Sequence, residues 1–336
     1  MYKIKADNTR KRATRAFSRV FGAIGGYTII SVAVIYVIQI ILSMFLGENE
    51  FASINENIYF VWGLQVFSMY LVAFPLLLLF VRKLPSAKRE KESMSLKELF
   101  YIFLVSEAVM IIGYFLSSII TSLFEKLLGH EIPNTTADLI QQTPVGLIIL
   151  IAVIIGPIVE EIIFRKIAID KLSIYGDRLA VIASAVAFGI FHGNFYQLIY
   201  ATALGIILGY VYTKTRKSIY NCIIHIAVNF IGTVPSLLTQ DALERLQAMP
   251  EGTIPQGSLL NDYYAVIGVS VIQYGLAALG IWVFIKATKN GAYRFTNNCD
   301  ERLQISDYPR VCFLNLGVIV FLIIGIGQCI LSLFLA

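Results

Sequence analysis

The chain has 336 residues, of which 57% are hydrophobic and 15% are charged. A soluble domain is about 45–50% apolar and about 25% charged, so this composition excludes a soluble enzyme, a disordered chain and a secreted disulfide scaffold. The net charge of +5 fits membrane topology better than binding to nucleic acid, which we do not expect as a partner.

Apolar segments of the length that a helix needs to cross a bilayer recur along the chain. They predict an all-α, polytopic transmembrane helical bundle of about nine spans, or eight if one span is re-entrant. The predicted spans are residues 21–47, 59–81, 100–124, 145–173, 179–195, 197–213, 218–238, 262–285 and 312–336. The first span is too long for a signal-peptide core, so we expect it to remain a membrane helix.

The spans divide the chain into four regions. These are a basic tail at 1–20, N-terminal membrane helices at 21–144, a membrane core at 145–238 and C-terminal membrane helices at 239–336. Of the 27 Lys and Arg residues, all but Lys126 and Arg245 fall in the segments expected on one side of the membrane. Because basic residues favour the cytoplasmic side, we expect an integral protein of a bacterial plasma membrane with its N-terminus in the cytoplasm.

Ionisable residues inside apolar segments carry the functional signal, because each is costly in a bilayer unless it is paired or solvated. Three groups occur in order: Glu160, Glu161 and Arg165; then Phe188 and His192; then His225 and Asn229. The last two residues of the first group, and the members of each later pair, are four apart and share a helix face. Glu107 lies in another span without a matching partner, which favours an interfacial or structural role.

Glu160 and His192 are expected at a similar depth. Spans 145–173 and 179–195 predict a hairpin that turns at Gly176, and both residues lie sixteen positions from that glycine. At about 1.5 Å per residue, each lies roughly 20–24 Å from the turn. We therefore expect the glutamate, both histidines and the asparagine to converge inside the bundle.

Two kinds of chemistry suit this set. A glutamate beside histidines can activate water for attack on a carbonyl, while a second histidine and an asparagine donate hydrogen bonds to the oxyanion. Alternatively, Glu160, His192 and His225 bind a divalent metal such as zinc and leave a fourth position for water. The residues alone leave both schemes open. They contain no HExxH, serine-based or CxxC motif and no glycine-rich phosphate loop.

The ordered motifs EExxxR, FxxxH and HxxxN resemble those of the CPBP intramembrane proteases over residues 145–238. This family is also called the Abi or CAAX-protease family, and it includes Rce1-type CAAX prenyl endopeptidases and bacteriocin-immunity relatives. The resemblance implies a helical membrane fold and endoproteolysis of a peptide substrate, with a metal-free glutamate mechanism ranked ahead of a metalloprotease. It makes Glu160 the water-activating base beside His192. It also implies that His225 and Asn229 stabilise the oxyanion, and that Glu161 and Arg165 support the site as an ion pair.

The leading hypothesis is an intramembrane endopeptidase, a hydrolase that acts on a membrane-associated or peptide substrate. The roles implied for bacterial relatives are peptide maturation, bacteriocin immunity and control of envelope signalling, whereas a prenylated substrate does not carry over. The alternative is a non-catalytic membrane scaffold that regulates a signalling or envelope partner. A transporter with a proton relay is disfavoured, because the sequence lacks repeat symmetry.

Overall fold

The computed structural model describes residues 2–250, 252–293 and 297–334, and the regular structure within them is entirely helical. The predicted all-α class is confirmed. The first elements are α1 (Tyr2–Phe45), α2 (Glu48–Glu56), α3 (Ile58–Val66), η1 (Phe67–Ala73), α4 (Phe74–Val81), α5 (Leu96–Leu128) and α6 (Thr135–Gln141). The central ones are α7 (Val145–Ile148), η2 (Ile149–Ile155), α8 (Gly156–Glu161), η3 (Ile162–Ile169), α9 (Asp170–Leu172), η4 (Ser173–Tyr175), α10 (Asp177–Phe191), α11 (Phe195–Thr215) and α12 (Ser218–Leu238). The last are α13 (Gln240–Gln247), α14 (Ser258–Lys289), η5 (Ile305–Asp307), α15 (Tyr308–Cys312) and α16 (Leu316–Leu331).

Within the described residues, seven helical stretches are long and apolar enough to cross a membrane, and a bent pair provides up to one more. The bent pair joins Ile305–Cys312 to Leu316–Leu331 at 59°. The predicted span 179–195 corresponds to α10, whose 15 residues fall short of the roughly 20 that cross a bilayer. The structure therefore agrees roughly with the predicted nine spans, and the difference lies in the short helix α10.

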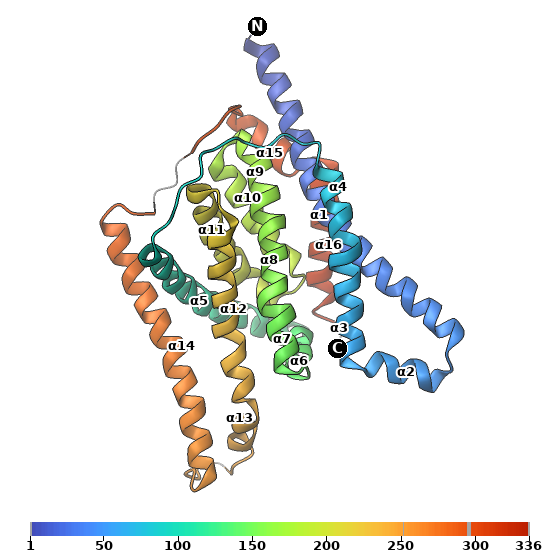
Figure 1. The fold of residues 1–336 in the computed structure, drawn as a ribbon, viewed down its shortest axis with the longest axis vertical. Helices are drawn as coiled ribbons and strands as arrows, with labels where there is room; N and C mark the ends of the chain where they lie inside the picture. The colour runs from blue at the N-terminus through green and yellow to red at the C-terminus, as the bar shows by residue number, and fades with distance from the viewer. Residues whose placement is uncertain (1, 251, 294–296, 335–336) are drawn as a thin grey trace.

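The basic segments between the spans gather at one end of the bundle, which is the upper end in Figure 1. The Lys217 ammonium donates to the Ser93 hydroxyl at 2.8 Å, and Arg89 pairs with Asp300 at 2.8 Å. The backbone N–H of Ala87 donates to the carbonyl of Asp170. This grouping agrees with the charge pattern, and the placement of that end in the cytoplasm remains a prediction.

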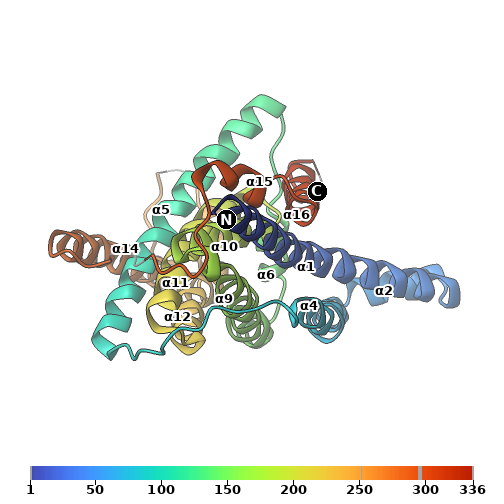
Figure 2. The same ribbon diagram turned by 90° about the horizontal axis from the view of Figure 1, so that it is seen from above.

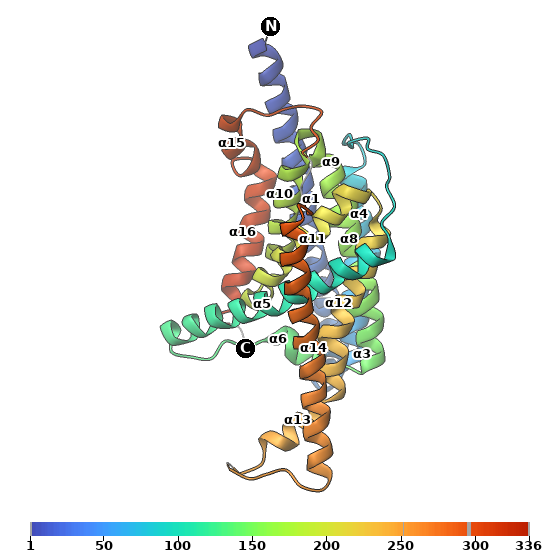
Figure 3. The same cartoon turned by 90° about the vertical axis from the view of Figure 1, so that its left-hand side faces the viewer.

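Helix α5 crosses the other helices obliquely, as Figure 3 shows, and packs against α11 and α14. Helices α1 and α16 pack on each other on the other side of the central helices (Figure 2). Large apolar side chains remain exposed on the outer helices, including Leu79, Ile119 and Trp282. In a membrane protein such side chains face the lipid.

Helices α10 and α11 form a tightly packed hairpin that fixes the end of α10. A Cβ at Gly205 would lie 2.9 Å from the Cα of Ala185, and one at Gly209 would lie 2.6 Å from a methyl carbon of Val181. Small residues let membrane helices approach closely without a hydrophobic driving force between them. The hairpin therefore holds the second predicted motif, at the end of α10, against the rest of the core.

Candidate active site

The two adjacent glutamates lie on α8, a six-residue helix between the π-helical segments η2 and η3. Pro157 has no backbone N–H, so a carbonyl in the preceding turn loses its usual helical donor. Pi-helical turns are rare in proteins, and those that occur often lie at functional sites. One stretch of a membrane-spanning helix therefore has both an irregular backbone and two carboxylates.

Glu161 is fully buried and contacts two polar side chains. Its Oε1 lies 2.9 Å from Nδ1 of His225, and its Oε2 lies 3.1 Å from Nε of Arg165. The guanidinium of Arg165 is also fully buried and makes no hydrogen bond to a described residue, so its contact with Glu161 is an ion pair without hydrogen-bond geometry. Its carbon lies 4.6 Å from the centre of the Phe188 ring, a cation–π contact.

Glu160 is the more accessible of the two adjacent carboxylates. Its side chain is 21% exposed, whereas that of Glu161 is inaccessible. The Oε2 of Glu160 lies 3.7 Å from Nε2 of His225. Because the other ring nitrogen contacts Glu161, His225 lies between the two carboxylates. This arrangement fits the turn of about 100° between successive helical residues.

The Phe188 ring brings both histidines of the set together. Its centre lies 5.0 Å from that of His192 and 5.7 Å from that of His225, both with edge-on geometry. His192 follows α10 directly and lies within electrostatic range of Glu160. The depth expected for Glu160 and His192 from the hairpin arithmetic agrees with this proximity.

Asn229 is linked to the candidate site by a hydrogen bond to the irregular backbone of η2. Its Nδ2 donates to the carbonyl of Ala152 in η2 at 3.1 Å, which leaves one amide N–H for another acceptor. In the same way, the Ser184 hydroxyl of α10 donates to the carbonyl of Phe164 in η3 at 2.6 Å. Side chains from α12 and α10 thus tie both π-helical segments to the bundle.

Three tyrosines near Glu160 are not among the site residues predicted from the sequence. Tyr27 of α1, Tyr70 of η1 and Tyr200 of α11 lie within electrostatic range of its carboxylate. The Tyr70 hydroxyl lies 3.6 Å from the position of a Cβ added to Gly156, one helical turn before Glu160. The chain contains 18 tyrosines, and no spacing or motif distinguishes these three.

The three residues expected to bind zinc are not grouped as a metal site in this arrangement. Among the described residues, no three His, Cys, Asp or Glu side chains form a group that could hold a metal ion. The contact of His225 Nδ1 with Glu161 leaves Nε2 as the ring atom that could bind a metal, and a carboxylate on the other nitrogen is common for metal-binding histidines. Zinc remains a prediction for metal analysis of the purified protein.

Comparisons with known proteins identify relatives of this arrangement. A family model described as "Type II CAAX prenyl endopeptidase Rce1-like" matches residues 142–231, which hold all seven predicted site residues. "Putative membrane peptidase YdiL" of Bacillus subtilis (strain 168) is 30% identical over 198 residues, which is 54% of this chain and 75% of that protein. "Membrane-embedded CAAX protease MroQ" of Staphylococcus aureus (strain USA300) is 28% identical over 145 residues, which is 41% of this chain and 58% of that protein. No solved structure matches the chain.

The similarity extends beyond the short motifs, since the Bacillus protein is matched over most of its own length. The family model covers the region that holds α8, α10 and the histidine-bearing part of α12. The chain therefore belongs to the CPBP family of membrane CAAX-type proteases.

Proposed function

We propose that the chain is an intramembrane endopeptidase in which the Glu160 carboxylate activates water. The observation that carries this proposal is the arrangement of three side chains from three helical elements: His192 and His225 both contact Phe188, and His225 also lies 3.7 Å from Glu160. Glu160 is the one member of the adjacent glutamate pair with an accessible carboxylate. A general base must reach the water whose proton it takes, so accessibility favours Glu160 over Glu161.

The reaction needs one proton carrier and one oxyanion site. Glu160 takes a proton from water while the water oxygen bonds to the carbonyl carbon of the peptide. The carbon–nitrogen bond then breaks, and Glu160 returns the proton to the departing amine. His192, His225 and the second amide N–H of Asn229 are the donors that we propose for the oxyanion.

Glu161 and Arg165 support this site without touching the substrate. Glu161 accepts from Nδ1 of His225, which fixes the ring so that Nε2 faces Glu160. Donation from Nε2 then requires a doubly protonated ring, and its charge is balanced by the carboxylates on either side. Arg165 balances the charge of Glu161 and packs on Phe188.

The substrate that we propose is a peptide or a membrane-associated protein segment. The name of the Staphylococcus relative refers to CAAX proteolysis, and the family model refers to prenylated substrates. For this chain we propose the broader peptide class, because no residue discussed above recognises a prenyl group. A bacterial plasma membrane, with the basic end of the bundle in the cytoplasm, is the proposed location.

The test compares peptide termini in membranes of cells that express the wild type, Glu160→Gln or Glu107→Gln at equal levels. Glu107 is a buried membrane glutamate outside the site, so it controls for the loss of a carboxylate from the bilayer. We expect new termini with the wild type and Glu107→Gln and at least about a hundredfold fewer with Glu160→Gln. Identical profiles in a host with the native partners would contradict the proposal and favour the scaffold.

A further inference from the structure

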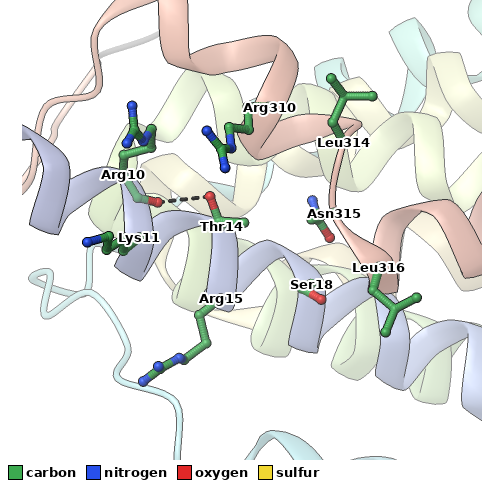
Figure 4. Close-up of a pocket in the computed structure, with 9 residues that line it drawn as sticks. All are labelled: Arg10, Lys11, Thr14, Arg15, Ser18, Arg310, Leu314, Asn315 and Leu316. Carbon is green, nitrogen blue, oxygen red and sulfur yellow. Dashed lines mark hydrogen bonds between the residues drawn. The ribbon is translucent and has the colours of Figure 1, made fainter.

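A basic hollow lies outside the candidate active site, between α1 and the bend that joins α15 to α16. Its volume is about 490 Å³, which is within the range of small-ligand sites. Arg10, Lys11, Arg15 and Arg310 line it, and its lining contains no acidic residue. Figure 4 shows the side chains of Arg10 and Arg310 close together at one side, while the Arg15 guanidinium points away from them.

The positive charge of the hollow is only partly neutralised. Asp7 pairs with Arg10 and Lys11, and Asp307 lies 3.6 Å from Arg10. The guanidinium of Arg310 forms no ion pair or hydrogen bond with any described residue. Arginine presents several N–H donors in a planar fork that matches the oxygens of phosphate. The ligand class that fits this hollow is therefore an anion with phosphate oxygens.

The walls of the hollow are held in place by a close helix crossing. The backbone N–H of Gly317 donates to the Ser18 hydroxyl at 3.0 Å, and the carbonyl of Ser18 leaves no space for a side chain at Gly317. The first turn of α16 thus lies against α1 at the edge of the hollow. The positive end of that helix dipole adds to the attraction for an anion.

Exposed apolar side chains adjoin the charged groups. Leu314 and Leu316 line the hollow at the bend and are 67% and 76% exposed. The bend lies at the end of the bundle where the basic segments gather (Figure 1). Basic groups beside apolar side chains at a helix end match the junction between lipid headgroups and acyl chains. A free phosphate ion would use only the charged half of this surface.

We propose that this hollow binds the phosphate of an anionic phospholipid, with Arg310 as its main unpaired cation and the acyl chains along Leu314 and Leu316. The site is separate from the proposed catalytic residues, so its test does not depend on protease activity. The phosphate group is shared with inorganic phosphate. The experiment therefore has to separate the two sources.

The test titrates the detergent-solubilised full chain with dioctanoyl phosphatidylglycerol, dioctanoyl phosphatidylcholine and inorganic phosphate. Arg310→Gln is compared with Arg302→Gln, which removes another exposed arginine of the same C-terminal segment outside the hollow. We expect Arg310→Gln to weaken phosphatidylglycerol binding about tenfold, as for the loss of a hydrogen bond to a charged group. Arg302→Gln and the wild type should bind phosphatidylglycerol equally and more tightly than phosphatidylcholine.

Each other outcome overturns part or all of the proposal. Equal binding by Arg310→Gln and wild type, or equal losses in both variants, would show that no site exists at this hollow. Inorganic phosphate that binds as tightly as phosphatidylglycerol would keep an anion site but overturn the lipid assignment. Wild-type melting temperatures of both variants without added ligand establish that lost binding is not unfolding.

Discussion

Two buried glutamates in this bundle have opposite surroundings. Glu161, between η2 and η3, contacts His225 on one oxygen and Arg165 on the other. Glu107 lies on α5 with 4% of its surface exposed, and its Oε1 has no hydrogen-bond partner among the described residues. The two glutamates also lie near different helices. Leu104 and Ala108, which flank Glu107 on α5, pack on Gly280 of α14.

The comparison shows that the contacts of a buried membrane carboxylate indicate its function. A buried charge is costly unless it is paired, and a network that pairs it across helices must be built by several elements at once. The network around Glu161 includes residues of η3 and α12, and it adjoins an accessible second carboxylate. Within the described parts of the chain Glu107 has no such network, so we expect it to tolerate replacement where Glu161 does not.

The largest effect should come from making Glu161 resemble Glu107. Arg165→Met removes the cation and leaves the Glu161 carboxylate buried beside a neutral side chain. We expect this to lower the free energy of unfolding in detergent by about 3–5 kcal/mol, as for other broken buried pairs. Thermal unfolding of the purified variant measures it, and proteolysis should fall as His225 loses its fixed orientation.

A double variant separates the broken pair from the loss of packing. Glu161→Leu with Arg165→Met removes both charges, and we expect it to cost less than the sum of the two single variants. Additive losses would mean that the ion pair contributes nothing and that the difference between Glu161 and Glu107 is not one of pairing.

The sequence predicted the residues of this network better than their contacts. Spacing of four residues placed Glu161 and Arg165 on one helix face, and they lie 3.1 Å apart there because helix geometry fixes that neighbourhood. The contact of His225 with Glu161 joins segments 64 residues apart and depends on how α12 packs on α8. Periodicity within one helix contains no such information.

The same difference applies to the fold. Features set by neighbouring residues could be predicted, and features set by packing between distant segments could not. Composition and apolar length predicted the membrane helices. The short helix α10 was counted as a span because the predicted segment 179–195 includes the turn at Gly193 and Asn194, which the structure places after the end of the helix. The placement of the Tyr70 hydroxyl beside Gly156 joins two segments far apart in the chain, for which the sequence contains no signal.

Ser184→Ala tests whether the irregular backbone of the network needs its side-chain donors. The variant removes the hydrogen bond from α10 to the carbonyl of Phe164 in η3. We expect a loss of about 1 kcal/mol in the free energy of unfolding. Ser118→Ala is the matched control, because the Ser118 hydroxyl donates to the carbonyl of Tyr114 within the same helix, α5, on an exposed face. Equal melting temperatures for the two variants would contradict this role.

Tyr70→Phe tests whether the region around Glu160 extends to residues outside the motifs. The change removes a hydroxyl near Gly156 and keeps the ring, so the melting temperature should stay at its wild-type value. We expect cleavage to fall roughly 2- to 10-fold, which corresponds to one hydrogen bond of about 0.5–1.5 kcal/mol. Tyr114→Phe, an exposed tyrosine on α5, should leave cleavage unchanged. Unchanged cleavage in Tyr70→Phe would limit the site to the residues of the three motifs.

Glu107→Gln should have the smallest effect, and it is the sharpest test of the comparison. The amide has nearly the shape of the carboxyl group and carries no charge, so it removes the cost of burying a carboxylate whose Oε1 has no partner among the residues that the structure describes. We expect the free energy of unfolding to change by less than about 0.5 kcal/mol, or to increase, and cleavage to continue. Glu161→Gln in parallel should be strongly destabilised, since it leaves the buried Arg165 guanidinium without a counter-charge. If both glutamines destabilised the bundle equally, pairing would not distinguish the two glutamates, and Glu107 would need a partner that α5 acquires only in the lipid bilayer.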